Sequence, residues 1–170
     1  MKFLLYTYII IFPLNLISQS VLQTDFYSIE IPEPLTYEKF KSDKEDLSNT
    51  DVYKIIDTKK EKIKYLVYLM SNKLNYNAKT ISEKNINEYL KDIGKSEILN
   101  IDKLLLKNKE VFKLKLSLDK EITGIVYLTS INDVLYRVLI MVPDKFFMNF
   151  KKEIDSICTN TRFLKDNWDS

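Results

Sequence analysis

The feature that most constrains the fold is a pair of apolar segments near the C-terminus, followed by an amphipathic one. Residues 122–129 and 134–142 have strand patterns, and the second is apolar on both faces. A strand that is hydrophobic on both faces has to be covered on both faces. Pro143 then removes a backbone donor, Asp144 is suited to begin a helix, and apolar residues recur at helical spacing up to Cys158. The sequence therefore predicts a layered fold.

The rest of the chain predicts more strands and one more helix. Further strand patterns occur at residues 26–31, 52–57, 63–70, 98–106 and 111–118. The short turns between the later segments favour antiparallel neighbours. Residues 34–51 are polar and are predicted to be a loop with at most one helical turn.

A second helix is predicted to start at Ser82. Ser82 has the residue type of an N-cap, and Ile81 and Ile86 have the spacing of a hydrophobic staple around it. Gly94 is placed to end the helix in a left-handed conformation. This is the best-specified local signal in the chain.

The first 20 residues are predicted to be a secretory signal peptide. An apolar run over residues 3–12 is followed by small residues at the −3 and −1 positions before Val21. The alternative is a retained membrane anchor, which would need about 20 uninterrupted apolar residues, whereas Pro13 and Asn15 interrupt this run. We therefore expect an exported protein, periplasmic or extracellular, with no membrane span after cleavage.

The length and charge of the chain indicate a single domain and disfavour a nucleic-acid-binding protein. Residues 21–164 have the length of one ordinary domain, followed by a polar tail at 165–170. Lysine and arginine number 26 against 24 acidic residues, so the net charge of +2 indicates no polyanionic partner. Arginine, the residue best suited to forked phosphate contacts, occurs only at Arg137 and Arg162, which disfavours nucleic-acid binding.

The single cysteine, Cys158, is expected to be a buried apolar residue of the last helix, not a reactive thiol. It has no second cysteine with which to form an internal disulfide. An exported protein without disulfides fits a bacterial envelope better than a eukaryotic secretory route.

The residue types exclude most catalytic chemistry. The chain has no histidine, which removes Ser-His-Asp and Cys-His systems and, with one cysteine, the usual zinc and copper sites. Gly94 and Gly124 are its two glycines, too few for a phosphate loop or a dinucleotide fingerprint. Ser117 and Lys120 have S-x-x-K spacing by chance, at a strand end. We predict no catalytic residue, metal site or cofactor. The one enzymatic alternative is a hydrolase that uses two carboxylates, and only generic acidic residues such as Glu30 and Glu33 support it.

Four residues are candidates for binding. Arg137 is flanked on its strand face by apolar residues, so it either packs its stem on the sheet with its head at a rim carboxylate, or binds an anion or ligand in a pocket. Leu74, Tyr76 and Trp168 are candidate contacts for a partner, although single exposed apolar residues need no special explanation.

A family resemblance covers most of residues 26–164. It rests on the opening Tyr27-Ser28-Ile29-Glu30-Ile31-Pro32 and on a closing helix with Ile154-Asp155-Ser156-Ile157, followed by Arg162-Phe163. With the order of the strands, these segments resemble the Mog/PsbP-like superfamily. The resemblance implies an α+β fold in which a mostly antiparallel sheet is sandwiched between helices (α/β/α). It also implies a scaffold for protein interaction, and it carries over no functional residue.

Two functional hypotheses follow. The first is an exported, non-enzymatic envelope protein that acts as a scaffold or accessory subunit and binds another envelope protein. The alternative is a carrier that holds a small apolar ligand or lipid between sheet and helix. The carrier hypothesis is suggested by aromatic residues at core positions of the predicted strands and helix: Phe112, Tyr127, Tyr136, Phe146, Phe147 and Phe150.

Overall fold

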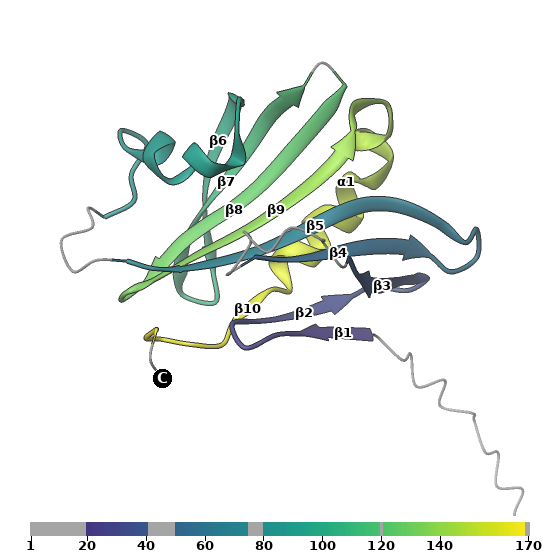
Figure 1. Cartoon of the computed structure of the whole chain (residues 1–170), viewed down its shortest axis with the longest axis horizontal. Coiled ribbons are helices and arrows are strands. Elements are labelled where there is room, and N and C mark those ends of the chain that lie inside the picture. The colour runs from purple at the N-terminus through teal and green to yellow at the C-terminus, as the bar shows by residue number, and fades with distance from the viewer. Residues whose placement is uncertain (1–19, 41–49, 75–79, 120, 169–170) are drawn as a thin grey trace, which may run out of the picture.

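The computed structural model describes residues 20–40, 50–74, 80–119 and 121–168 (Figure 1). Its central element is a seven-stranded antiparallel sheet with the strand order β3-β4-β5-β9-β8-β7-β6. The strands are β3 (Leu35–Lys39), β4 (Thr50–Asp57), β5 (Lys62–Lys73), β6 (Glu97–Leu106), β7 (Lys109–Asp119), β8 (Ile122–Ile131) and β9 (Val134–Pro143). The strands predicted from residue patterns are all present, with ends that differ by a few residues.

The strand β9 lies inside the sheet, between β5 and β8. Its residues from Val134 to Ile140 are all buried, as is Val142. The prediction that this strand is covered on both faces is confirmed. Side chains on its two faces belong to two separate hydrophobic clusters, because successive side chains of a strand point to opposite sides of the sheet.

One face of the sheet is covered by α1 (Asp144–Thr159) and by a second, three-stranded sheet. The small sheet has the order β1-β2-β10, with β1 (Ser20–Gln23), β2 (Tyr27–Ile31) and β10 (Arg162–Phe163). The helix is held by Ile154 and Ile157 in the core and by ion pairs on either side. Lys64 lies 2.8 Å from Glu153, and the Nζ of Lys113 lies 2.6 Å from the carboxylate of Asp155.

The opposite face is covered by two 3₁₀ turns, η1 (Ile86–Tyr89) and η2 (Lys91–Ile93). The α-helix predicted from Ser82 is therefore wrong. The side chain of Asn85 accepts hydrogen bonds from the N–H and hydroxyl of Ser82, at 2.8 and 3.0 Å, and donates to the carbonyl of Thr80. These local bonds compete with a helical N-cap. Ile86 is still buried, and the segment ends at Gly94, whose φ is 88°.

The predicted fold class is thus confirmed only in part. The sheet is mostly antiparallel, but α1 is the one α-helix among the described residues, so the sheet is not sandwiched between α-helices. No helix in these residues is long and apolar enough to cross a membrane. The predicted signal peptide falls almost entirely outside the described residues, and only Ser20 of it, in β1, is seen.

Besides the two-residue β10, two short strands lie where the sequence predicts none. β3 occupies part of the polar segment interpreted as a loop, and it pairs with β4 through Leu35 opposite Asp57. β1 pairs with β2 from Ser20 opposite Ile31. Both are edge strands of four or five residues, and such strands take their conformation from the neighbour that they pair with, so their own pattern is weak.

A buried tyrosine of the small sheet bonds the backbone of the large sheet. The hydroxyl of Tyr27 donates to the carbonyl of Met70 and accepts a hydrogen bond of 3.0 Å from the N–H of Arg137. Met70 and Arg137 face each other in the β5–β9 pair. The hydroxyl of a β2 residue therefore inserts into the ladder at the centre of the main sheet, and burial raises the pKa of this phenol above its usual value.

Replacing Tyr27 by phenylalanine tests this junction. Tyr27→Phe leaves a buried carbonyl and a buried N–H without the hydroxyl, so we expect a loss of about 1–3 kcal/mol in the free energy of unfolding. Urea unfolding followed by circular dichroism measures it. The matched control is Tyr37→Phe, which removes an exposed hydroxyl 2.9 Å from the carbonyl of Val21, with an expected loss below about 0.5 kcal/mol. Equal losses in the two variants would contradict the proposed role of Tyr27.

Candidate functional site

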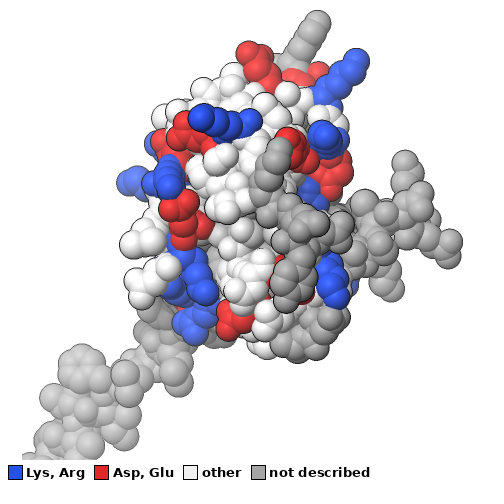
Figure 2. Space-filling model, turned by 90° about the vertical axis from the view of Figure 1, so that its left-hand side faces the viewer, with Lys and Arg blue, Asp and Glu red and all other residues white. Residues whose placement is uncertain are grey.

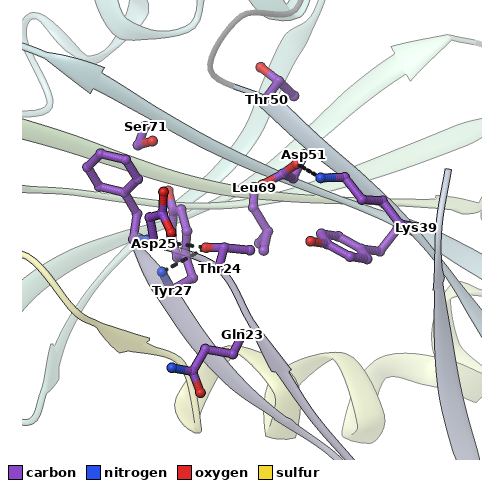
Figure 3. Close-up of a pocket in the computed structure, with 11 residues that line it drawn as sticks. Gln23, Thr24, Asp25, Tyr27, Lys39, Thr50, Asp51, Leu69 and Ser71 are labelled. Carbon is purple, nitrogen blue, oxygen red and sulfur yellow. Dashed lines mark hydrogen bonds and ion pairs between the residues drawn. The ribbon is translucent and has the colours of Figure 1, made fainter. Parts of the chain in front are cut away.

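A cleft of about 400 Å³ opens between the β1–β2 turn and the strands β3, β4 and β5 (Figure 3). Its walls come from segments that are far apart in the sequence. The lining residues are Gln23, Thr24, Asp25, Phe26, Tyr27, Lys39, Thr50, Asp51, Tyr53, Leu69 and Ser71. The cleft therefore lies at the seam between the small sheet and one edge of the large sheet.

The wall formed by the β1–β2 turn is shaped by Thr24. Its Oγ1 accepts hydrogen bonds from the N–H groups of Phe26 and Tyr27, at 3.3 and 3.0 Å, and its own N–H donates to the carbonyl of Tyr27 at 2.9 Å. A threonine that binds the backbone two and three residues on is typical of a tight turn. This turn holds Asp25 at its exposed tip, on the rim of the cleft.

The facing wall carries an ion pair. The Nζ of Lys39 on β3 lies 2.5 Å from the carboxylate of Asp51 on β4, and this hydrogen bond raises the pKa of Lys39. Burial raises the pKa of the neighbouring Tyr53, and the charge of Asp51 adds to this effect. Leu69 and Ser71 are buried and form the inner part of the cleft.

This arrangement suits recognition of a polar or cationic group. Asp25 and Asp51 against Lys39 leave the cleft with one more negative than positive charge, and no hydrogen bond or ion pair of the Asp25 carboxylate occurs among the described residues. Hydroxyl and amide groups of the other lining residues add donors and acceptors. The described part of the chain contains no cluster of three side chains able to hold a metal ion.

Sequence reasoning missed this cleft. Asp25, Lys39 and Asp51 are charged residues of the kind found in any surface loop, and only the pairing of β3 with β4 and the packing of β2 bring them together. The one signal was the clustering of polar residues at a strand end, which is too common to indicate a site.

The structure places Arg137, the predicted candidate for anion binding, in a hydrogen-bond network that pairs both terminal nitrogens of its guanidinium and leaves the buried Nε without a hydrogen bond among the described residues. Its side chain crosses to the face covered by the 3₁₀ turns, where Nη1 is 3.1 Å from the carbonyl of Tyr89 and pairs with Asp92, and Nη2 bonds the side chain of Asn72. Arg137 is 4% exposed, whereas the Asp92 side chain is 57% exposed. This geometry matches the first alternative from the sequence, in which the guanidinium of Arg137 pairs with a carboxylate at the rim of the sheet. Arg137 does not line the cleft.

The three residues predicted as partner contacts are not brought together. Leu74 is half-buried against the cluster beneath the 3₁₀ turns, and its N–H donates to the carbonyl of Asp133. Trp168 is half-buried, and its ring centroid lies 5.0 Å from that of Phe26. The predicted C-terminal tail therefore packs against the domain at Trp168. Tyr76 lies outside the described residues.

A second cavity, of about 180 Å³, lies beside the 3₁₀ face. Its lining includes Ile81, Phe112 and Thr129, and the hydroxyl of Thr129 donates to the carbonyl of Glu110 at 2.6 Å. It is smaller than the cleft, and Arg137 does not line it.

The two arginines of the chain form a matched pair for testing the role of Arg137. Arg137→Ala removes a buried cation together with its hydrogen bonds to Asn72 and to the carbonyl of Tyr89, so we expect a loss of about 2–4 kcal/mol in unfolding free energy. Arg162→Ala removes an exposed arginine that lies 3.3 Å from Glu30, with an expected loss below about 1 kcal/mol. Chemical denaturation measures both. An Arg137→Ala protein as stable as the wild type would contradict the structural role.

The predicted burial of Cys158 is confirmed, and it has a measurable consequence. The residue is 1% exposed, and burial raises the pKa of its thiol. Because the thiolate is the reactive form, we expect the native protein to react with Ellman's reagent at least about 100-fold more slowly than the protein in guanidinium chloride. The absorbance of the released thiolate reports on this cysteine alone. Rapid reaction of the folded protein would show that the α1 packing opens readily.

Comparisons with known proteins support the fold and go no further. The sequence matches no family model and no curated protein. The structure is similar to cyanobacterial PsbP (CyanoP) from Synechocystis sp. PCC 6803, with a TM-score of 0.63 and 10% identity over 89% of this chain and 95% of that one. It is also similar to the Ran-binding protein Mog1p of Saccharomyces cerevisiae, with a TM-score of 0.56 and 11% identity over 87% and 97% of the two chains. The resemblance seen in the sequence is thus confirmed at the level of the fold, which this chain shares with CyanoP and Mog1p.

Proposed function

We propose that this protein is an exported, non-enzymatic accessory protein that binds another protein through the polar cleft. The observation that carries the proposal is the cleft itself, whose rim presents the carboxylate of Asp25, unpaired within the described part of the chain, with the Lys39–Asp51 ion pair on the facing wall. Charged groups at an accessible rim mainly supply specificity and association rate, as expected for a contact between proteins. The partner group that this rim favours is a lysine or arginine side chain.

The fold gives the proposal independent support. The similar structure Mog1p is, by its title, a Ran-binding protein, so a domain of this architecture can serve as a protein-binding module. The identity of 11% transfers neither the partner nor the binding surface to this chain. Export rests on the signal-like N-terminal sequence, and the non-enzymatic character rests on the residue types that the chain lacks.

Nothing in the described structure favours the alternative of an apolar-ligand carrier. Tyr127 and Tyr136 are buried within the core beneath α1, and Phe112 is buried in the core on the other face. The ring of Phe146 lies 5.9 Å from that of Phe150, on α1 itself. Phe146 is 41% exposed on the surface of α1, whereas the three buried aromatic residues pack against protein. The cleft of about 400 Å³ is lined mainly by polar side chains.

Native mass spectrometry of the protein purified gently from its own host tests the proposal. We expect a complex whose additional mass is a second polypeptide, together with a chain mass equal to residues 21–170. Asp25→Lys should weaken the complex by at least about tenfold in Kd, because a lysine replaces the carboxylate at the rim of the cleft.

The matched control is Glu88→Lys, which makes the same charge reversal at an exposed position of η1, on the other face of the sheet. It should leave the complex intact. Equal weakening by both variants would indicate a nonspecific effect of net charge. A small discrete added mass in place of a polypeptide would overturn the proposal in favour of a carrier, and a chain that keeps residues 1–20 would contradict export with cleavage.

A further inference from the structure

The strand β6 forms a free edge of the main sheet, at the opposite end of the strand order from the cleft. It is ten residues long and pairs only with β7 among the described strands. Figure 2 views the molecule from the left-hand side of Figure 1, where β6 lies, and shows uncharged surface across the middle of this side with charged residues around it. A long free edge offers unpaired backbone groups to another chain.

The turn after β6 determines which backbone groups point outward. Lys107 and Asn108 have positive φ angles, 47° and 66°, as in a two-residue type I′ hairpin. Leu106 and Lys109 then form the hydrogen-bonded pair next to the turn, and bonded pairs alternate along an antiparallel ladder. The N–H and C=O groups of Ile101, Lys103 and Leu105 therefore point away from β7, toward the free edge.

The side chains of β6 give this edge little protection. Leu99 is 52% exposed and Leu105 is 72% exposed, and the strand contains no proline. Natural edges are commonly blocked by prolines, several charges or bulges. β6 has one register shift between Ile98 and Asn100, which leaves residues 100–106 as a regular strand without proline, whose charged side chains are Asp102 and Lys103.

The charged side chains of β6 favour a different protein over a second copy of this chain as the strand that pairs with it. Two copies paired antiparallel over all of residues 100–106 would place Lys103 opposite Lys103 of the second copy, and a shift toward the N-terminus would place Asp102 opposite Asp102. Like charges directly opposite each other are destabilising. The carboxylate of Asp102 is exposed and has no hydrogen bond or ion pair among the described residues, because Lys113, opposite it on β7, bonds Asp155.

We propose that β6 binds an extended segment of another protein by strand addition, with a basic residue of that segment opposite Asp102 and apolar residues opposite Leu104 and Leu105. The main-chain groups of Ile101, Lys103 and Leu105 supply the hydrogen bonds, and the side chains supply the specificity. The inference rests on the proposed protein-binding function, but its surface is distinct from the cleft.

The probe is a synthetic nine-residue peptide with lysine at its centre, valine at the positions two and three residues before the lysine, and threonine elsewhere. When it adds antiparallel with the lysine opposite Asp102, the two valines lie opposite Leu104 and Leu105. Amide hydrogen exchange measured by NMR should show the N–H groups of Ile101, Lys103 and Leu105 exchanging fast in the free protein and at least about tenfold more slowly with the peptide. A peptide with glutamate in place of the lysine should bind at least about threefold more weakly. Slow exchange at these three amides without peptide, or no change at millimolar peptide, overturns the proposal.

Two variants separate backbone from side-chain effects. Leu105→Pro removes one outward N–H without removing a bond to β7, and it should abolish the peptide-dependent protection of Ile101 and Lys103. Leu105→Thr keeps the N–H and should retain that protection within about threefold. Light scattering should give a monomer mass for the free protein, and a dimer that Leu105→Pro dissociates would mean that a second copy occupies the edge, contrary to the proposal.

The same exchange experiment distinguishes strand addition at β6 from binding at the cleft. Asp25→Lys should leave the peptide-dependent protection of β6 unchanged, since Asp25 lies at the other end of the strand order. A failure at β6 with an intact effect of Asp25→Lys on the native complex would overturn strand addition and leave the proposed function standing.

Discussion

The contact between Tyr27 and the β5–β9 ladder is the interaction on which the rest of the structure depends. The hydroxyl binds backbone groups of Met70 and Arg137 in a buried site, so the small sheet is joined to the main sheet through a position where an unpaired polar group would be costly. β2 is consequently held over β5 and β9, and the space between β2 and the β3 edge remains as the cleft.

Arg137 extends the same junction to the other face. Its backbone N–H binds Tyr27 on one side of the sheet, and its side chain binds Tyr89 and Asp92 on the other. One residue of the central strand therefore links both covering layers to the sheet. This explains an arginine within an otherwise apolar strand without invoking a ligand, because a buried guanidinium needs partners, and the 3₁₀ turns and Asn72 of β5 supply them for its two terminal nitrogens.

The two candidate contact surfaces differ in their physical nature. The cleft presents side-chain charge at a seam between two sheets, whereas β6 presents backbone hydrogen-bonding groups along an open edge. A protein with both surfaces is suited to hold two segments of a larger assembly, or two parts of one partner.

The sequence by itself determined the strands from β4 to β9, the helix α1, the burial of Cys158 and the covering of both faces of β9. These follow from local periodicity and from the number of apolar residues that each element must bury. Tertiary structure alone decided the short strands β1, β3 and β10, which form because a neighbour supplies their hydrogen bonds. It also replaced the predicted helix at Ser82 with 3₁₀ turns, where Asn85 and the packing of Ile86 outweigh the capping signal. The cleft could not be read from the sequence, because Asp25, Lys39 and Asp51 become neighbours only when two sheets pack together.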